Sequence, residues 1–277
     1  MVEKSREVPP SVQPKSGDIA FDLDRALESI VTVQSTIPSD AFTAQILGTE
    51  RAGSGVVIGD SGLVLTIGYL VTEAETVWLR GASGPPVPAH PLAIDQETGF
   101  ALVQALGALN LPALPFGSAR ATSIGDPVVM VGGGGGRKQA VRARIVAKQE
   151  FSGYWEYHLD EAIFTAPAHP LWGGAGLISA DGKLLGIGSL HVQQQNERGQ
   201  REEVNMIVPI DLLPPVLNDL LTLGRVNKPA RPWLGVYSAE NGGRIVIADV
   251  TEDGPAAAAG ASSVTSAITI LPPFSAE

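Results

Sequence analysis

The strongest constraint on this fold is a long series of short apolar runs. These runs are separated by turn sequences and not by helices. The runs extend from about Ile19 to Ile210, and each has the length and composition of a strand. Turn sequences such as Asp60-Ser61-Gly62 and Asp181-Gly182 interrupt them. Because the strands follow one another without helices, we expect an all-β protein whose antiparallel sheets close into barrels. The expected strands cover residues 55–58, 63–66, 76–79, 100–104, 127–131, 141–146, 163–165 and 184–189.

One helix is expected after these strands, over residues 211–224. Asp211 is placed to cap it, and Pro214 and Pro215 fit a first turn, where backbone N–H groups have no partner within the helix. Gly224 ends it. The predicted organisation is a polar, proline-rich disordered tail over 1–18, a barrel domain over 19–224, a linker over 225–232 and a further segment over 233–277.

Charge and composition exclude several classes of function. The net charge is −10 and the 19 basic residues are few and scattered, which disfavours nucleic acid as a partner. The chain has no cysteine, so thiolate metal sites and a cysteine nucleophile are excluded, and no pattern predicts a metal or a cofactor. No run reaches the ~18–20 apolar residues that cross a bilayer. Without a signal peptide in the first twenty residues, we expect a cytoplasmic protein as written, and a periplasmic one if a leader is missing.

Four groups of motifs, colinear in the chain, carry the main functional signal. They are GSGVVI with GLVLT over 53–66, IDQETGFAL over 94–102, FGS with IGDPV over 116–128, and TAPAHPLWGGAGL with DGKLLGI over 165–187. In this order the motifs resemble the HtrA (DegP/DegQ-like) branch of the trypsin-fold serine proteases. The resemblance extends from about Ile30 to Gly260 and implies a trypsin-like double β-barrel with a C-terminal helix and a partial PDZ segment.

The resemblance also places three residues where the family carries its catalytic triad. Tyr69 stands at the position of the general-base histidine, and Gly99 stands at that of the aspartate that orients it. With one residue deleted, Gly173 takes the place of the nucleophilic serine, and Leu171 and Trp172 replace the Gly-Asn pair of the oxyanion loop. Serine protease chemistry needs a nucleophile oxygen, a base and an acid, so these substitutions predict that no catalytic residue remains.

The four histidines of the chain are the candidates to replace the missing base. His169 lies four residues before Gly173, and His191 follows a strand that lines the specificity pocket in the family. Neither has a serine and a carboxylate at a recognised spacing. We therefore interpret these two, with His90 and His158, as loop or barrel-rim histidines.

The glycine run over residues 132–136 has two interpretations. It follows an expected strand and superficially fits a dinucleotide-binding loop. However, no acidic residue closes a following strand about 20 residues later, as that fingerprint requires. Val141 and Ala143 alternate with Arg142 and Arg144, which is strand periodicity. We therefore favour a flexible hairpin loop.

A fifth motif of the same resemblance lies in the C-terminal segment. WLGV over 233–236, with DGPAA over 253–257, resembles the opening of a PDZ domain, in which this loop presents N–H groups to a peptide carboxylate. Trp233, Leu234, Gly235 and Val236 are therefore the candidate peptide-binding residues. The family pattern breaks at residues 261–264, so we expect a truncated PDZ-like segment. The alternative is that a half-domain cannot form the peptide-binding groove, and that the segment 233–236 has only a packing role.

These features predict a catalytically inactive HtrA-like pseudoprotease that binds a polypeptide or a partner protein. Relatives of this type also imply a homotrimer. One alternative is an active serine-type endopeptidase with a rearranged site, which requires a serine, a histidine and an acid to converge in space. Another is a decayed gene product without a selected role.

Overall fold

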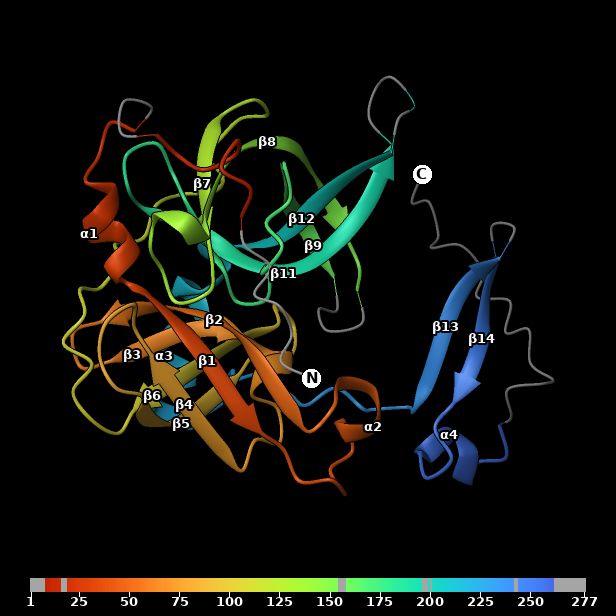
Figure 1. Ribbon diagram of the computed structural model, residues 1–277. Helices are drawn as coiled ribbons and strands as arrows, with labels where there is room; N and C mark the ends of the chain where they lie inside the picture. The colour runs from red at the N-terminus through yellow and green to blue at the C-terminus, as the bar shows by residue number, and fades with distance from the viewer. Residues whose placement is uncertain are drawn as a thin grey trace. The chain divides into compact units, whose positions relative to one another are not determined.

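Two closed six-stranded β-barrels form the main body of the protein (Figure 1). The computed structural model describes residues 8–15, 19–153, 158–195, 199, 201–241 and 244–261. The strand order is β1-β2-β3-β6-β5-β4 in the first barrel and β10-β11-β12-β9-β8-β7 in the second. Neighbouring strands pair in antiparallel fashion, for example β1 with β2 and β7 with β8. The prediction of an all-β double barrel is therefore confirmed.

All eight expected strands lie within strands of the structure, and β1, β5, β10 and β12 are additional. The first barrel contains β1 (Ile30–Thr36), β2 (Glu50–Gly59), β3 (Leu63–Ile67), β4 (Thr76–Arg80), β5 (Val87–Ile94) and β6 (Phe100–Ala105). The second contains β7 (Pro127–Val131), β8 (Ala140–Phe151), β9 (Leu159–Ala166), β10 (Gly176–Ile178), β11 (Leu184–Gln195) and β12 (Arg201–Pro209).

Alternation of side chains explains how these strands enclose two cores. In β8, Val141 and Ala143 are buried whereas Arg142 and Arg144 are exposed, as expected when successive side chains point to opposite faces of a sheet. One large apolar cluster includes Leu65, Phe100 and Leu102, and a second includes Met130, Ile145 and Leu177. Burial of this apolar area is the main stabilising contribution to the fold.

The glycine run over residues 132–136 lies in the β7–β8 connection, together with the short helix η2 (Arg137–Gln139). The hairpin interpretation is confirmed, because β7 and β8 pair directly. Gly133, Gly134, Gly135 and Gly136 all have positive φ. The loop is, however, closely packed at Gly135, where an added Cβ atom would collide with the carbonyl oxygen of Leu27. The expectation of a flexible loop did not include this contact.

The predicted cap of the C-terminal helix was wrong. The helix exists as α3 (Pro214–Leu223) and ends at Gly224 with φ 70°, but no side chain caps its start. The Asp211 carboxylate instead accepts hydrogen bonds from Ser118 and Ala119, because a helical turn, η3 (Ile210–Leu212), precedes α3 and turns Asp211 toward that loop. Within the expected disordered tail, Val8 and Pro14 are buried, whereas residues 9–11 and Lys15 are exposed. The remaining tail residues, 1–7 and 16–18, lie outside the described residues.

The short helices α1 (Leu23–Glu28) and α2 (Ala44–Leu47) complete the first unit, which extends to Asn227. The second unit starts at Lys228 and contains a hairpin of β13 (Val236–Asn241) and β14 (Arg244–Val250), followed by α4 (Pro255–Ala258). Within the described residues, no helix is long and apolar enough to cross a membrane.

Candidate functional site

Tyr69 lies in the 3-10 helix η1 (Gly68–Leu70), directly after β3. Its hydroxyl donates a 2.7 Å hydrogen bond to the carbonyl oxygen of Ser189 in β11, and so links the first barrel to the second. The buried guanidinium of Arg51 donates to the carbonyl oxygens of Tyr69 and Thr72 at 2.8 and 3.1 Å. Desolvation by burial lowers the pKa of Arg51. Arg51 therefore holds the backbone of the turn that carries Tyr69.

The structure brings the three predicted triad positions together. A Cβ atom added at Gly173 would lie 2.9 Å from the Tyr69 hydroxyl, so positions 69 and 173 are neighbours. The carbonyl oxygen of Gly99 accepts a 2.6 Å hydrogen bond from the N–H of Gly68, which precedes Tyr69. Because Gly99 and Gly173 have no side chains, the phenol of Tyr69 is the one side chain that these positions supply.

The loop before Gly173 is held by a buried histidine. His169 is 0% exposed, and burial lowers its pKa, which favours the neutral imidazole. Its Nε2 lies 2.8 Å from the carbonyl oxygen of Gln139, and its Nδ1 accepts a 2.9 Å bond from the N–H of Leu171. The two bonds require the Nε2–H tautomer. Asn205 exchanges hydrogen bonds with the His169 backbone, so this loop is anchored to β12 and η2.

Trp172 and His191 form a second contact beside the three positions. Their rings stack with centroids 5.1 Å apart and an interplanar angle of 23°. His191 Nε2 also lies 2.8 Å from a carboxylate oxygen of Glu203 across the β11–β12 pair. The sequence did not indicate this stack, which covers the loop next to Gly173.

Comparisons with known proteins fit this architecture. Residues 53–187 match the family model of the trypsin-like peptidase domain. The serine endoprotease DegS of Haemophilus influenzae is 30% identical over 222 residues, which cover 77% of this chain and 63% of the relative. A probable periplasmic serine endoprotease, DegP-like, of Pseudomonas fluorescens is 28% identical over 223 residues, which cover 76% of this chain and 45% of the relative. The chain belongs to the HtrA family.

Solved structures show the HtrA fold as well. The HtrA-type protease AlgW with a tripeptide superposes with a TM-score of 0.58 at 22% identity, over 86% of this chain and 79% of the other. The same protease with a decapeptide gives a TM-score of 0.57 at 22% identity, over 86% and 81% of the two chains. At this identity the likeness concerns the fold alone. This chain spans 45% of the length of the DegP-like relative and 63% of the length of the DegS relative.

The HtrA framework also carries a serine, a histidine and a carboxylate in contact at another place, which sequence spacing did not reveal. On the β8–β9 hairpin, Ser152 Oγ lies 3.0 Å from His158 Nδ1, and His158 Nε2 lies 3.5 Å from an Asp160 oxygen. The side chains of His158 and Asp160 are 50% and 102% exposed. A cross-strand surface cluster of this kind is screened by water and is not preorganised as a buried triad is.

Two further predictions concern His90 and metal binding. His90 is exposed on β5. Across the described ranges, no group of three histidine or acidic side chains is placed to hold a metal ion.

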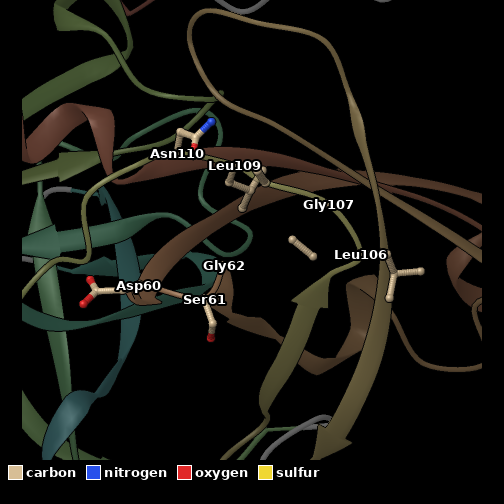
Figure 2. Close-up of a pocket in the computed structure, with 9 residues that line it drawn as sticks. Asp60, Ser61, Gly62, Leu106, Gly107, Leu109 and Asn110 are labelled. Atoms are coloured by element: carbon tan, nitrogen blue, oxygen red, sulfur yellow. The ribbon is translucent and has the colours of Figure 1, made fainter.

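A hollow of about 390 Å³ lies between the β2–β3 turn and the segment after β6. Figure 2 shows that the side chains of Asp60, Ser61 and Asn110 around this hollow point in different directions and not to a common centre. A binding pocket needs a few converging polar groups, so this hollow does not extend the site in this HtrA chain.

The candidate peptide-binding residues lie in the second unit. Trp233 and Leu234 are 54% and 59% exposed. The carbonyl oxygens of Leu234 and Gly235 accept hydrogen bonds from the N–H groups of Ala256 and Thr251, both at 2.9 Å. Val236 begins β13 and pairs with Val250. The segment is therefore ordered by its own hairpin and α4, and it leaves two large apolar side chains exposed.

Proposed function

We propose that this HtrA-family chain is a catalytically inactive protein that binds a polypeptide or a partner protein. The observation that carries the proposal is Gly173, which lies where a Cβ would meet the Tyr69 hydroxyl. By the family resemblance this is the nucleophile position, and a glycine offers no oxygen to attack a carbonyl carbon. A phenol, with an ordinary pKa of about 10, is a poor general base near neutral pH.

The loop geometry supports the same proposal. In trypsin-fold enzymes the oxyanion hole uses the N–H of the nucleophile and that of the residue two positions before it. In this chain the second donor corresponds to Leu171, and its N–H already donates to His169 Nδ1. Loss of one oxyanion donor lowers kcat by roughly 10²–10³. In this proposal the site therefore has neither a nucleophile nor a second free N–H donor for an oxyanion.

Binding is the function that the retained parts support. Trp233 to Val236 form our proposed peptide-binding segment within a PDZ-like unit over 233–277, connected by the linker 225–232 to the barrel domain 19–224. Relatives named as serine endoproteases and a structural neighbour solved with a decapeptide point to polypeptide as the ligand class. A homotrimer and, from the DegP-like relative, a periplasmic location belong to the same proposal.

Unfolded casein tests the proposal directly. We expect the purified chain to bind labelled casein, measured by fluorescence anisotropy, and to release no fragments on mass spectrometry after prolonged incubation. Replacing Trp233 and Leu234 with Ser is expected to weaken binding at least about tenfold, since two exposed apolar side chains are lost. Replacing Phe42 and Ile46, which are also exposed, is the matched control and is expected to leave binding unchanged. Casein fragments, or equal binding by all variants, would overturn the proposal.

The second candidate function is a serine endopeptidase with a rearranged site, which the Ser152–His158–Asp160 cluster favours. The Ser152→Ala variant decides between the two. If casein is cleaved and this variant is inactive, the enzyme interpretation is correct. We expect that neither the wild-type chain nor the variant cleaves casein, because the cluster is open to water.

A further inference from the structure

A groove on the outside of the second barrel concentrates positive charge on an acidic protein. It has a volume of about 420 Å³ and is bounded by residues 11–12 of the N-terminal segment, by β8, and by the ends of β7 and β9. Its described lining includes Arg142 and Arg144 and contains no acidic residue. The groove includes none of positions 69, 99, 173 and 233–236, so the proposed function does not depend on it.

The local charge is stronger than a count of basic residues suggests. Residues 137–148 contain two lysines and three arginines of the 19 basic residues in the chain, and no acid. The description of the basic residues as scattered is therefore incomplete. Two of these five residues form ion pairs outside the groove: Arg137 pairs with Asp24 at 2.7 Å and Lys148 pairs with Glu161 at 3.0 Å. Arg142 and Arg144 are the two that face the groove.

The spacing of Arg142 and Arg144 along β8 places their side chains on one face of the strand. They lie two residues apart on one strand, so their side chains leave the same face about 7 Å apart. Arg144 donates through Nη1 to the carbonyl oxygen of Gly125 at 3.0 Å, a bond that orients a group with five donors. The N–H of Arg142 donates to the carbonyl oxygen of Val12 at 2.8 Å, which holds the N-terminal wall against β8.

The other walls suit a peptide backbone. Pro127 and Pro167 are exposed, and Val12 and Ala166 complete a small apolar surface. We propose that this groove binds an extended acidic polypeptide segment whose alternate side chains are Asp or Glu. In an extended chain, side chains two residues apart share a face and repeat at the spacing of the two guanidinium groups, each of which can hold a carboxylate with two hydrogen bonds. Nucleic acid is disfavoured, because the groove supplies two cationic side chains, whereas nucleic-acid binding depends on neutralising several phosphates.

Fluorescence anisotropy with a labelled peptide of alternating Glu and Ala tests the proposal on the full chain. We expect saturable binding that weakens as salt is raised. The double variant Arg142→Gln/Arg144→Gln is expected to bind at least tenfold more weakly. Arg25→Gln/Arg80→Gln removes the same charge from exposed positions outside the groove and is expected to bind as the wild type does. Circular dichroism confirms that both variants are folded.

Three outcomes would overturn the proposal: no saturable binding, equal weakening by both double variants, or tighter binding of a single-stranded DNA of equal charge. Equal weakening would mean that net charge, and not the groove, attracts the peptide. Tighter binding of DNA would assign the groove to phosphates. None of these outcomes bears on the casein experiment, whose variants lie elsewhere in the chain.

Discussion

At the residue scale, the proposal depends on Tyr69 and His169, whose side chains make hydrogen bonds to the backbone around the proposed triad positions. The Tyr69 hydroxyl links the barrels through Ser189, and the His169 imidazole occupies the N–H of Leu171. Motif order could locate positions 69, 99 and 173. It could not reveal the His169 bonds, because two of the partners, Gln139 and Asn205, lie 30 and 36 residues away.

Reintroducing the triad tests the role of His169. We expect the variant Tyr69→His/Gly99→Asp/Gly173→Ser to react slowly with a peptide ester, since the Leu171 N–H remains bound to His169. Adding His169→Asn, which removes the imidazole that accepts this N–H, is expected to raise the rate roughly 10²-fold, the value of one oxyanion donor. Ester hydrolysis by the two variants, with circular dichroism as the control for folding, measures the difference. Equal rates would contradict this role for His169.

The buried His169 also makes stability depend on pH. Its pKa in the folded state is lowered, chiefly by desolvation, below the value of about 6.5 of an exposed histidine. The unfolded state therefore binds more protons below that pH, so the stability contributed by the neutral form is present above about 6.5 and is lost as the pH falls toward the folded-state pKa.

Urea unfolding between pH 7.5 and 5.5 measures this dependence. We expect the wild-type free energy of unfolding to fall more steeply with decreasing pH than that of His169→Asn. His90→Gln removes an exposed histidine and is expected to keep the wild-type slope. A His169→Asn slope as steep as that of the wild type would contradict the assignment.

At the scale of elements, strands were more predictable than helices. The eight expected strands have clear apolar runs, whereas α1 and α2, of six and four residues, are too short to show a helical period. Asp211 had the right sequence context for a cap, but the preceding turn redirected its carboxylate to Ser118. Packing of Val8 depends on a core that forms far along the chain, which local composition does not indicate.

The glycine-rich β7–β8 connection provides a test at this scale. Gly135 and Gly136 have φ of 86° and 92°, which a side chain strains by about 1–2 kcal/mol. Nothing lies within 4 Å of a Cβ at Gly136, whereas one at Gly135 would meet the Leu27 carbonyl oxygen. We expect Gly136→Ala to cost about 1–2 kcal/mol and Gly135→Ala about 3 kcal/mol or more, because overpacking adds to the strain. Equal losses in urea unfolding would show that the loop is not packed against α1.

At the scale of the whole molecule, the trypsin-like double barrel is present, and our proposal is that the positions equivalent to the triad are substituted. A fold supports many functions, so the double barrel by itself does not imply proteolysis. Composition correctly indicated an acidic protein with a large apolar core, but only the structure shows that Arg142 and Arg144 line one groove. The barrels belong to the first unit, which ends at Asn227, and the proposed peptide-binding segment belongs to the second, which begins at Lys228.

The central claim is that this chain has no activated serine, and a fluorophosphonate probe tests it most directly. Such probes form a covalent bond with the nucleophilic serine of an active site, and intact-protein mass spectrometry counts the adducts. We predict no adduct on the folded chain under conditions in which an active HtrA-type protease is fully labelled. One adduct per chain on Ser152 or any other serine, lost when the protein is unfolded before labelling, would contradict the account.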